Sequence, residues 1–76
     1  TPITSPMVGT IFLSPEPGAE PFIQVGDTIS EGQTVMLIEA MKTYNPVRAT
    51  KSGKVMQILV EDSTPVEFDE ELLLVE

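Results

Sequence analysis

Two residue types that carry much of the chemistry of small proteins are absent: the 76-residue chain has no cysteine and no histidine. Without cysteine it forms no disulfide and no thiolate metal site, and nothing indicates its redox compartment. Without histidine it lacks the usual general base near neutral pH and the commonest metal ligand. A chain of this length also has little room for a substrate cleft. We therefore expect a domain that is not an enzyme on its own.

Positive charge is scarce as well. Four Lys and Arg residues stand against twelve Asp and Glu residues, for a formal net charge of −8. Binding to nucleic acid or to an anionic membrane needs clustered basic side chains, so neither partner is expected. No apolar run of about 20 residues is present to cross a bilayer, and the first residues do not have the charged-then-apolar pattern of a signal segment. The acidic runs do not have the spacing of a calcium loop, so no metal site is predicted.

Strand signals dominate what remains, in a chain whose length predicts one small domain over residues 1–76. Short runs rich in β-branched and bulky residues recur, bounded by Gly, Pro, Asp or Ser. These runs cover residues 8–13, 22–25, 34–38, 55–60 and 72–75. Gly26-Asp27 and Ser52-Gly53 mark turns between them. Many short strands with close-set turns predict a small all-β sandwich or barrel.

A weak internal repeat divides the chain. A shift of 44 residues aligns residues 3–11 with residues 47–55, and a shift of 37 aligns residues 22–39 with residues 59–76. The first copy therefore ends at Glu39, and the second begins near Asn45. Repeats of this kind indicate two similar supersecondary units that form one core together.

The first copy is longer than the second by seven residues, because the shift changes between Phe12 and Phe22. The additional residues fall in the segment Ser14, Pro15, Glu16, Pro17, Gly18, Ala19, Glu20 and Pro21. Three prolines and a glycine in eight positions exclude a helix or an interior strand. The segment is predicted to be an inserted loop, stiffened by proline.

Five residues, Ala40–Tyr44, separate the two copies, and Lys42 lies in the middle of them. Ser30 and Gln33 have the spacing of a capping box, and good helix formers follow, which favours a helix over residues 31–44. The alternative is a strand, a tight turn at Met41-Lys42 and a return strand. The repeat favours this alternative, because the matching run at the C-terminus lacks helix formers. A two-residue hairpin turn would project the lysine clear of the sheet.

Three groups of motifs give the chain a family resemblance. They are Ser5-Pro6-Met7-Val8-Gly9-Thr10, the central Glu39-Ala40-Met41-Lys42, and Val66-Glu67-Phe68-Asp69 with Leu74-Val75-Glu76. With these in register over essentially the whole length, the chain resembles the biotinyl domains of the biotin carboxyl carrier proteins of acetyl-CoA carboxylase. That resemblance implies a flattened β-barrel of two antiparallel four-stranded sheets with quasi-two-fold symmetry. It also implies a modified lysine at a hairpin tip and chain ends in the opposite sheet.

The same resemblance implies site residues. Lys42 would carry biotin as an amide made by a biotin protein ligase. Glu39, Ala40 and Met41 would form the motif that the ligase recognises. The inserted loop, Ser14 to Pro21, would be the thumb of this carrier family, which lies near the biotin. Thr43 departs from the family, whose members often have methionine or leucine after the lysine.

The resemblance further implies a non-catalytic carrier that shuttles carboxybiotin between biotin carboxylase and carboxyltransferase, for malonyl-CoA formation in fatty acid synthesis. It implies a location in the bacterial cytoplasm, which is favoured, or in the plastid stroma. It also implies that the chain is the C-terminal domain of a longer protein.

Three alternatives stay open. The first is a biotinyl domain of another carboxylase or of a decarboxylase, and the inserted loop disfavours it. The second is a lipoyl carrier domain, a family that typically has Asp where this chain has Met41. The third is an unmodified β-domain that serves only as an interaction module. Tyr44 and Phe68 are expected in the core or at its edge, and Met41 either at the core edge or in recognition.

Overall fold

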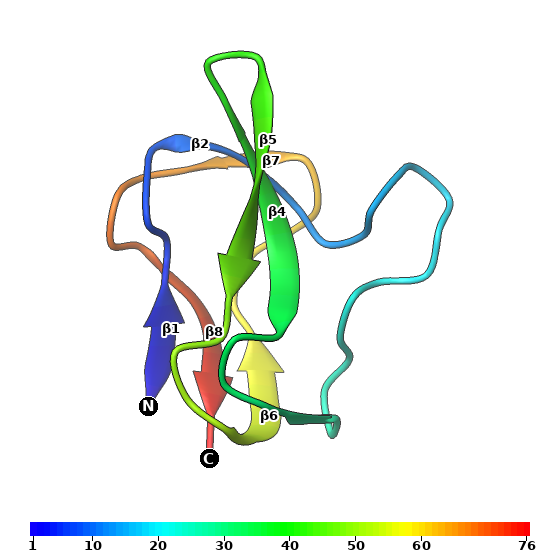
Figure 1. Cartoon of the computed structure of the whole chain (residues 1–76), viewed down its shortest axis with the longest axis vertical. Coiled ribbons are helices and arrows are strands. Elements are labelled where there is room, and N and C mark those ends of the chain that lie inside the picture. The colour runs from blue at the N-terminus through cyan, green and yellow to red at the C-terminus, as the bar shows by residue number, and fades with distance from the viewer.

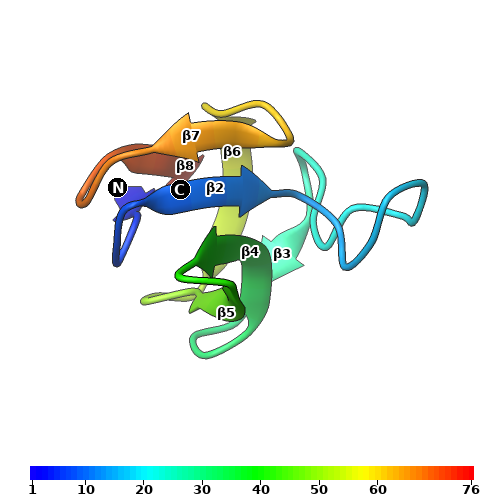
Figure 2. The same ribbon diagram turned by 90° about the horizontal axis from the view of Figure 1, so that it is seen from above.

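The computed structural model describes residues 1–76 and contains eight strands and no helix. The strands are β1 (Pro2–Thr4), β2 (Gly9–Phe12), β3 (Thr28–Ile29), β4 (Thr34–Ala40), β5 (Thr43–Arg48), β6 (Gly53–Ile58), β7 (Thr64–Val66) and β8 (Glu71–Val75). They form two four-stranded antiparallel sheets, ordered β1-β8-β6-β3 and β5-β4-β2-β7 (Figures 1 and 2). The prediction of an all-β fold with two such sheets is confirmed. No helix has the length and apolar character needed to span a bilayer.

The quasi-two-fold symmetry is visible in the strand order. Replacing β1 by β5, β8 by β4, β6 by β2 and β3 by β7 converts the order of one sheet into that of the other. The first four strands therefore play the same parts as the last four, as the repeat predicts. Each unit contributes strands to both sheets, so neither unit can bury its apolar face without the other.

The hydrophobic core lies between the two sheets. Its members come from both halves of the repeat: Ile3, Ile11, Ile23, Ile29, Val35, Met36, Ile38, Val47, Ala49, Val55, Val66, Leu72, Leu73 and Val75. Full burial of one such aliphatic side chain contributes about 1.5–3 kcal/mol. Val35, Met36 and Ile38 belong to β4, so the core anchors the strand that leads into the β4–β5 turn.

Two glycines permit close approach between strands. A Cβ on Gly9 would overlap the backbone carbonyl oxygen of Glu39, and one on Gly53 would overlap that of Glu76. Both pairs are equivalent in the repeat: Gly9 matches Gly53, and Glu39 matches Glu76. Both copies of the repeat therefore need glycine at this position. In the first copy the position lies beside Glu39, just before the β4–β5 turn.

Both chain ends lie in the sheet opposite the β4–β5 hairpin. β1 pairs with β8, and the Thr1 ammonium donates to the Val75 carbonyl at 2.7 Å. Figure 1 shows both ends at the pole of the molecule away from the β4–β5 turn. This placement confirms the expectation drawn from the resemblance.

One predicted strand is wrong. Residues 22–25 do not pair in a sheet; Phe22 instead donates its backbone N–H to the Leu13 carbonyl at 2.9 Å, and Ile23 points into the core. Of this run only Ile23 is buried and Phe22 is half-buried, whereas Val25 is 61% exposed. The short strands β1, β3 and β7 have two or three residues each, too few for a periodic signal.

The expectation for two aromatic residues is also wrong. Tyr44 is 60% exposed and Phe68 is 67% exposed, so neither belongs to the core. Tyr44 lies on β5 against the ring of Phe12, with ring centroids 5.9 Å apart. Phe68 occupies a turn between β7 and β8, where the backbone N–H of Asp69 donates to the Ser5 carbonyl.

Candidate functional site

The β4–β5 hairpin ends in the tightest possible connection. Pairing runs from Thr34 opposite Arg48 to Ala40 opposite Thr43, which leaves only Met41 and Lys42 as turn residues. Both turn residues have left-handed backbones, with φ of 54° and 66°. Positive φ at both central positions defines a type I′ turn, which matches the twist of the flanking strands. The predicted tight turn at Met41-Lys42 is confirmed, and no helix forms over residues 31–44.

The turn is built from unfavourable residues. Type I′ turns prefer Asn-Gly or similar pairs, because left-handed backbone costs other L-residues about 1–2 kcal/mol each. Neither Met41 nor Lys42 belongs to the favoured types. The pairing of β4 with β5 and the packing of β4 on the core hold the turn in this conformation. Strained residues of this kind cluster at functional positions.

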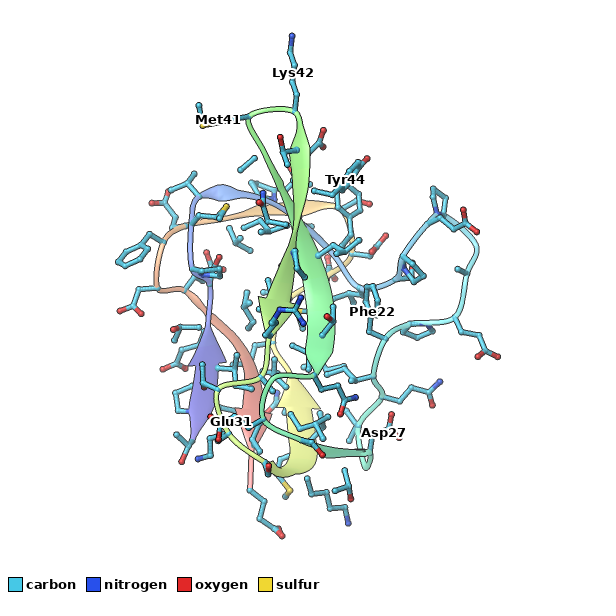
Figure 3. The ribbon with its side chains drawn as sticks, in the orientation of Figure 1. Phe22, Asp27, Glu31, Met41, Lys42 and Tyr44 are labelled. Carbon is cyan, nitrogen blue, oxygen red and sulfur yellow. The ribbon has the colours of Figure 1, made fainter.

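The turn presents its side chains to solvent. Met41 is 96% exposed, so the alternative that placed it at the core edge is wrong. Lys42 is exposed, and its side chain extends away from the molecule at the tip of the hairpin (Figure 3). Glu39 and Ala40 precede it on β4 and are partly buried. In this motif the two strand residues are therefore partly buried, and the two turn residues, including the lysine with its amine, are exposed.

A side-chain amide braces the hairpin below its tip. Asn45 donates from Nδ2 to the Thr43 carbonyl at 3.1 Å and, more weakly, to the Ile38 carbonyl at 3.5 Å. These bonds tie β5 to itself and across to β4. The amine of Lys42 therefore rises from a fixed base, and its freedom comes from its own four-carbon stem.

The inserted loop leaves and rejoins the sheet at one place. The bond between Phe22 N–H and the Leu13 carbonyl closes it, so the loop comprises residues 14–21, the range the sequence predicts. Inside the loop, the Ser14 hydroxyl and the Ala19 N–H both donate to the Glu16 carbonyl, at 3.0 and 3.1 Å. In Figure 1 the loop stands out to one side of the hairpin.

A cavity of about 270 Å³ separates the loop from the hairpin. It is lined by Phe12, Ser14, Pro15, Glu16, Pro17, Leu37, Tyr44, Asp62 and Ser63. Aromatic and aliphatic side chains from β2, β4 and β5 face prolines of the loop, and hydroxyls and carboxylates complete the lining. Such a mixture suits a small, flat molecule with an apolar body and polar edges.

The structure assigns the predicted loop residues to two groups. Ser14, Pro15, Glu16 and Pro17 line the cavity, whereas Gly18, Ala19, Glu20 and Pro21 lie outside its lining. Sequence reasoning missed Phe12, Leu37, Tyr44, Asp62 and Ser63 as lining residues. Tyr44 had a signal, since it follows Lys42 by two residues on the same hairpin. No sequence signal indicated Asp62, because it contacts Leu13 at the start of the loop from 49 residues further along the chain.

The chain is similar to known proteins over nearly its whole length. A family model described as "Biotin-requiring enzyme" matches residues 1–75. The chain is 49% identical over 74 residues to the biotin carboxyl carrier protein of acetyl-CoA carboxylase 2, chloroplastic, of Arabidopsis thaliana, covering 97% of this chain and 29% of that protein. It is 45% identical over 74 residues to the carrier protein of Haemophilus influenzae, covering 97% of this chain and 48% of that protein.

A solved structure is similar as well. The urea carboxylase of Kluyveromyces lactis superposes with a TM-score of 0.80 at 34% identity, covering all of this chain and 6% of that enzyme. The chain therefore spans less than half the length of these relatives and a small part of the carboxylase.

Proposed function

Because the chain belongs to the family of biotin-requiring enzymes, we propose that it is a carrier domain that holds biotin covalently on Lys42. The observation that carries this proposal is the exposed amine at the tip of a two-residue hairpin (Figure 3). The proposal treats residues 1–76 as one carrier domain, with residues 14–21 as its thumb. The domain performs no chemistry on its own.

Attachment requires one acyl transfer. A biotin protein ligase would activate the carboxylate of biotin, and the uncharged amine of Lys42 would attack it. The amide bond forms, the activating group leaves, and the amine nitrogen gives up one proton to solvent or to the ligase and keeps the other as the amide N–H. Exposure of Lys42 serves this step, because the ligase active site must enclose the amine itself.

The attached biotin would shuttle a carboxyl group between two enzymes. Biotin would supply a ring nitrogen that accepts a carboxyl group: a biotin carboxylase would add it from bicarbonate with hydrolysis of ATP, and a carboxyltransferase would pass it to acetyl-CoA, giving malonyl-CoA for fatty acid synthesis. The tether keeps the group at high effective concentration at both active sites without releasing it. The names of the relatives from Arabidopsis thaliana and Haemophilus influenzae support this assignment to acetyl-CoA carboxylase.

The thumb and the cavity would receive the biotin head. Residues 14–17 of the thumb line a space that Tyr44 of the hairpin also lines, two residues from the attachment point. The fused rings of biotin combine an apolar sulfur-containing side with a ureido group that donates and accepts hydrogen bonds. The cavity offers both kinds of surface, which supports biotin contact for residues 14–17 of the thumb, whereas residues 18–21 lie outside its lining.

The relatives support two locations. They come from bacteria and from chloroplasts, and both kinds reach 49% identity. We place the domain in the bacterial cytoplasm or the plastid stroma, and the preference for bacteria stays a prediction.

The proposal is tested by modifying the domain in vitro. Incubation with a biotin protein ligase, biotin and ATP should increase the intact mass by one biotinyl group, and peptide mapping should place it on Lys42. Incubation with a lipoate ligase and lipoate is the control, and no mass change is expected there. Lipoylation without biotinylation, or a biotin on another lysine, would contradict the proposal.

Recognition by the ligase is tested at Met41. We expect Met41→Asn to stabilise the domain by about 0.5–1 kcal/mol, because Asn adopts left-handed backbone more readily. If Met41 is a recognition residue, as we propose with Glu39 and Ala40, the same variant should lower kcat/KM for biotinylation at least tenfold. Urea unfolding and initial ligation rates measure the two effects. Met56→Asn, a change at an exposed methionine on β6 away from the hairpin, is the control and should leave kcat/KM unchanged.

A further inference from the structure

The root of the thumb is bound by a carboxylate from a distant part of the chain. Leu13, where the thumb leaves β2, donates its backbone N–H to Oδ1 of Asp62 at 2.8 Å. The other oxygen of Asp62 accepts from the Ser63 hydroxyl at 3.0 Å. Ser63 in turn donates its backbone N–H to the Ile11 carbonyl at 2.8 Å. The turn at residues 62–63 is therefore fastened to the last residues before the thumb.

Both ends of the thumb depend on Leu13. Its N–H is held by Asp62, and its carbonyl accepts the N–H of Phe22, where the thumb returns. The hydrogen bonds within the thumb converge on the Glu16 carbonyl. A displacement of Leu13 would therefore move both roots of the thumb together.

Asp62 and Ser63 also line the cavity, together with residues 14–17. Ser63 has a left-handed backbone, with φ of 63°, although it is not glycine. Such conformations persist when the surrounding contacts hold them. The turn at Asp62 and Ser63 therefore shapes the cavity in two ways. It lines the cavity itself, and through Leu13 it positions the thumb.

We propose that Asp62 is a positioning residue that fixes the thumb root and so keeps the cavity open for the head of the biotinyl-lysine. This inference rests on the proposed function for the identity of the ligand. The hydrogen bonds that Asp62 accepts from Leu13 and Ser63, which we call the clamp, do not depend on the proposed function, since they are present in the unmodified chain. Asp62 also lines the cavity, and the role proposed here acts through its hydrogen bonds with Leu13 and Ser63.

Four substitutions separate geometry from charge. Asp62→Ala removes both acceptors, whereas Asp62→Asn keeps an oxygen for Leu13 and an amide that can donate to the Ser63 hydroxyl. Asp62→Ser suits a turn, but its hydroxyl cannot reach both partners, so it replaces the alanine variant should that one not fold. Glu61→Ala is the matched control, because it removes a neighbouring exposed carboxylate that forms no side-chain hydrogen bond.

The first test uses the unmodified domain. Because the chain has no cysteine, cysteines introduced at Glu20 and Thr43 would be its only thiols and would accept a pair of spin labels. Pulsed electron resonance then gives the distribution of thumb–hairpin distances. We expect Asp62→Ala or Asp62→Ser to widen this distribution at least twofold, while Asp62→Asn and Glu61→Ala match the parent. Equal widths in Asp62→Ala and Glu61→Ala, or a widened Asp62→Asn, would overturn the clamp.

The second test uses the biotinylated domain. Exchange of the two ureido N–H protons should be at least fivefold slower than in free biotin amide for the parent, Asp62→Asn and Glu61→Ala. In Asp62→Ala it should be within twofold of the free amide. Unretarded exchange in the parent would overturn the role of the clamp in holding biotin. Failure of Lys42 to accept biotin at all would count against the proposed function alone, because the spin-label test needs no biotin.

Discussion

Replacing Lys42 by arginine is expected to abolish biotin incorporation while leaving the fold and its stability unchanged. The guanidinium stays protonated and has no free lone pair, so it cannot attack an activated carboxylate. Lys42 is exposed at the tip of the hairpin, outside the core. We expect a loss of labelling of at least about 1,000-fold, since the variant lacks the nucleophile altogether. The free energy of unfolding should change by less than about 0.5 kcal/mol, as for other surface substitutions.

The matched control is Lys54→Arg, which makes the same exchange at an exposed residue of β6. It should accept biotin at the parent rate. Intact mass after ligation and urea unfolding of each variant measure both quantities. If Lys42→Arg were still biotinylated at another lysine, the hairpin would not be the attachment site. Loss of labelling in Lys54→Arg would point to a different attachment residue.

A large loss of stability is expected when Gly9 is replaced by alanine. The new Cβ would overlap the Glu39 carbonyl oxygen, which is backbone, and would crowd the side chain of Ile38. Backbone cannot swing aside as a flexible side chain does, so β2 must move away from β4. We expect the free energy of unfolding to fall by roughly 2–4 kcal/mol. For a domain of this size, this lowers the melting temperature by roughly 10–25 °C.

Comparison with Gly18→Ala separates the cost of steric overlap at Gly9 from the cost of placing a residue with a side chain in left-handed backbone. Gly18 has a left-handed φ of +81°, and a Cβ there would meet no atom within 4 Å. Its substitution should cost only about 1–2 kcal/mol, the price of left-handed backbone. Gly53→Ala should resemble Gly9→Ala, because Gly53 meets the Glu76 carbonyl in the same way. If Gly9→Ala proves no more costly than Gly18→Ala, the close approach of β2 to β4 does not constrain the fold.

The hairpin that carries Lys42 was predictable from the repeat, but its turn chemistry was not. The matched copies place a strand before residue 40 and another after residue 43, so a short connection follows. Local preference pointed elsewhere, toward a helix over residues 31–44. Met41 and Lys42 are poor residues for a type I′ turn, and the pairing of β4 with β5 and the packing of β4 on the core impose it. Tertiary structure overrides local preference at the position where the site lies.

For the thumb as well, the position in the chain was predictable from the sequence and the contacts were not. A break in the repeat located it between Phe12 and Phe22, because insertion changes the spacing of the two copies. Its attachment was hidden, since Asp62 lies 49 residues from Leu13 and no spacing rule links them. The exposed positions of Phe68 and Tyr44 were misjudged because aromatic residues are usually taken for core. The apolar run at residues 22–25 was misread for a related reason, since burial alone does not make a strand.

The placement of both chain ends at the pole away from Lys42 has a practical consequence. A fluorescent protein, an affinity tag or a sensor surface joined at Thr1 or Glu76 would sit on the far side of the molecule from the hairpin. Immobilised copies would then all display the amine outward in one orientation. With biotin on Lys42, as we propose, the domain would serve as a site-specific handle for streptavidin capture, whichever end the fused cargo occupies.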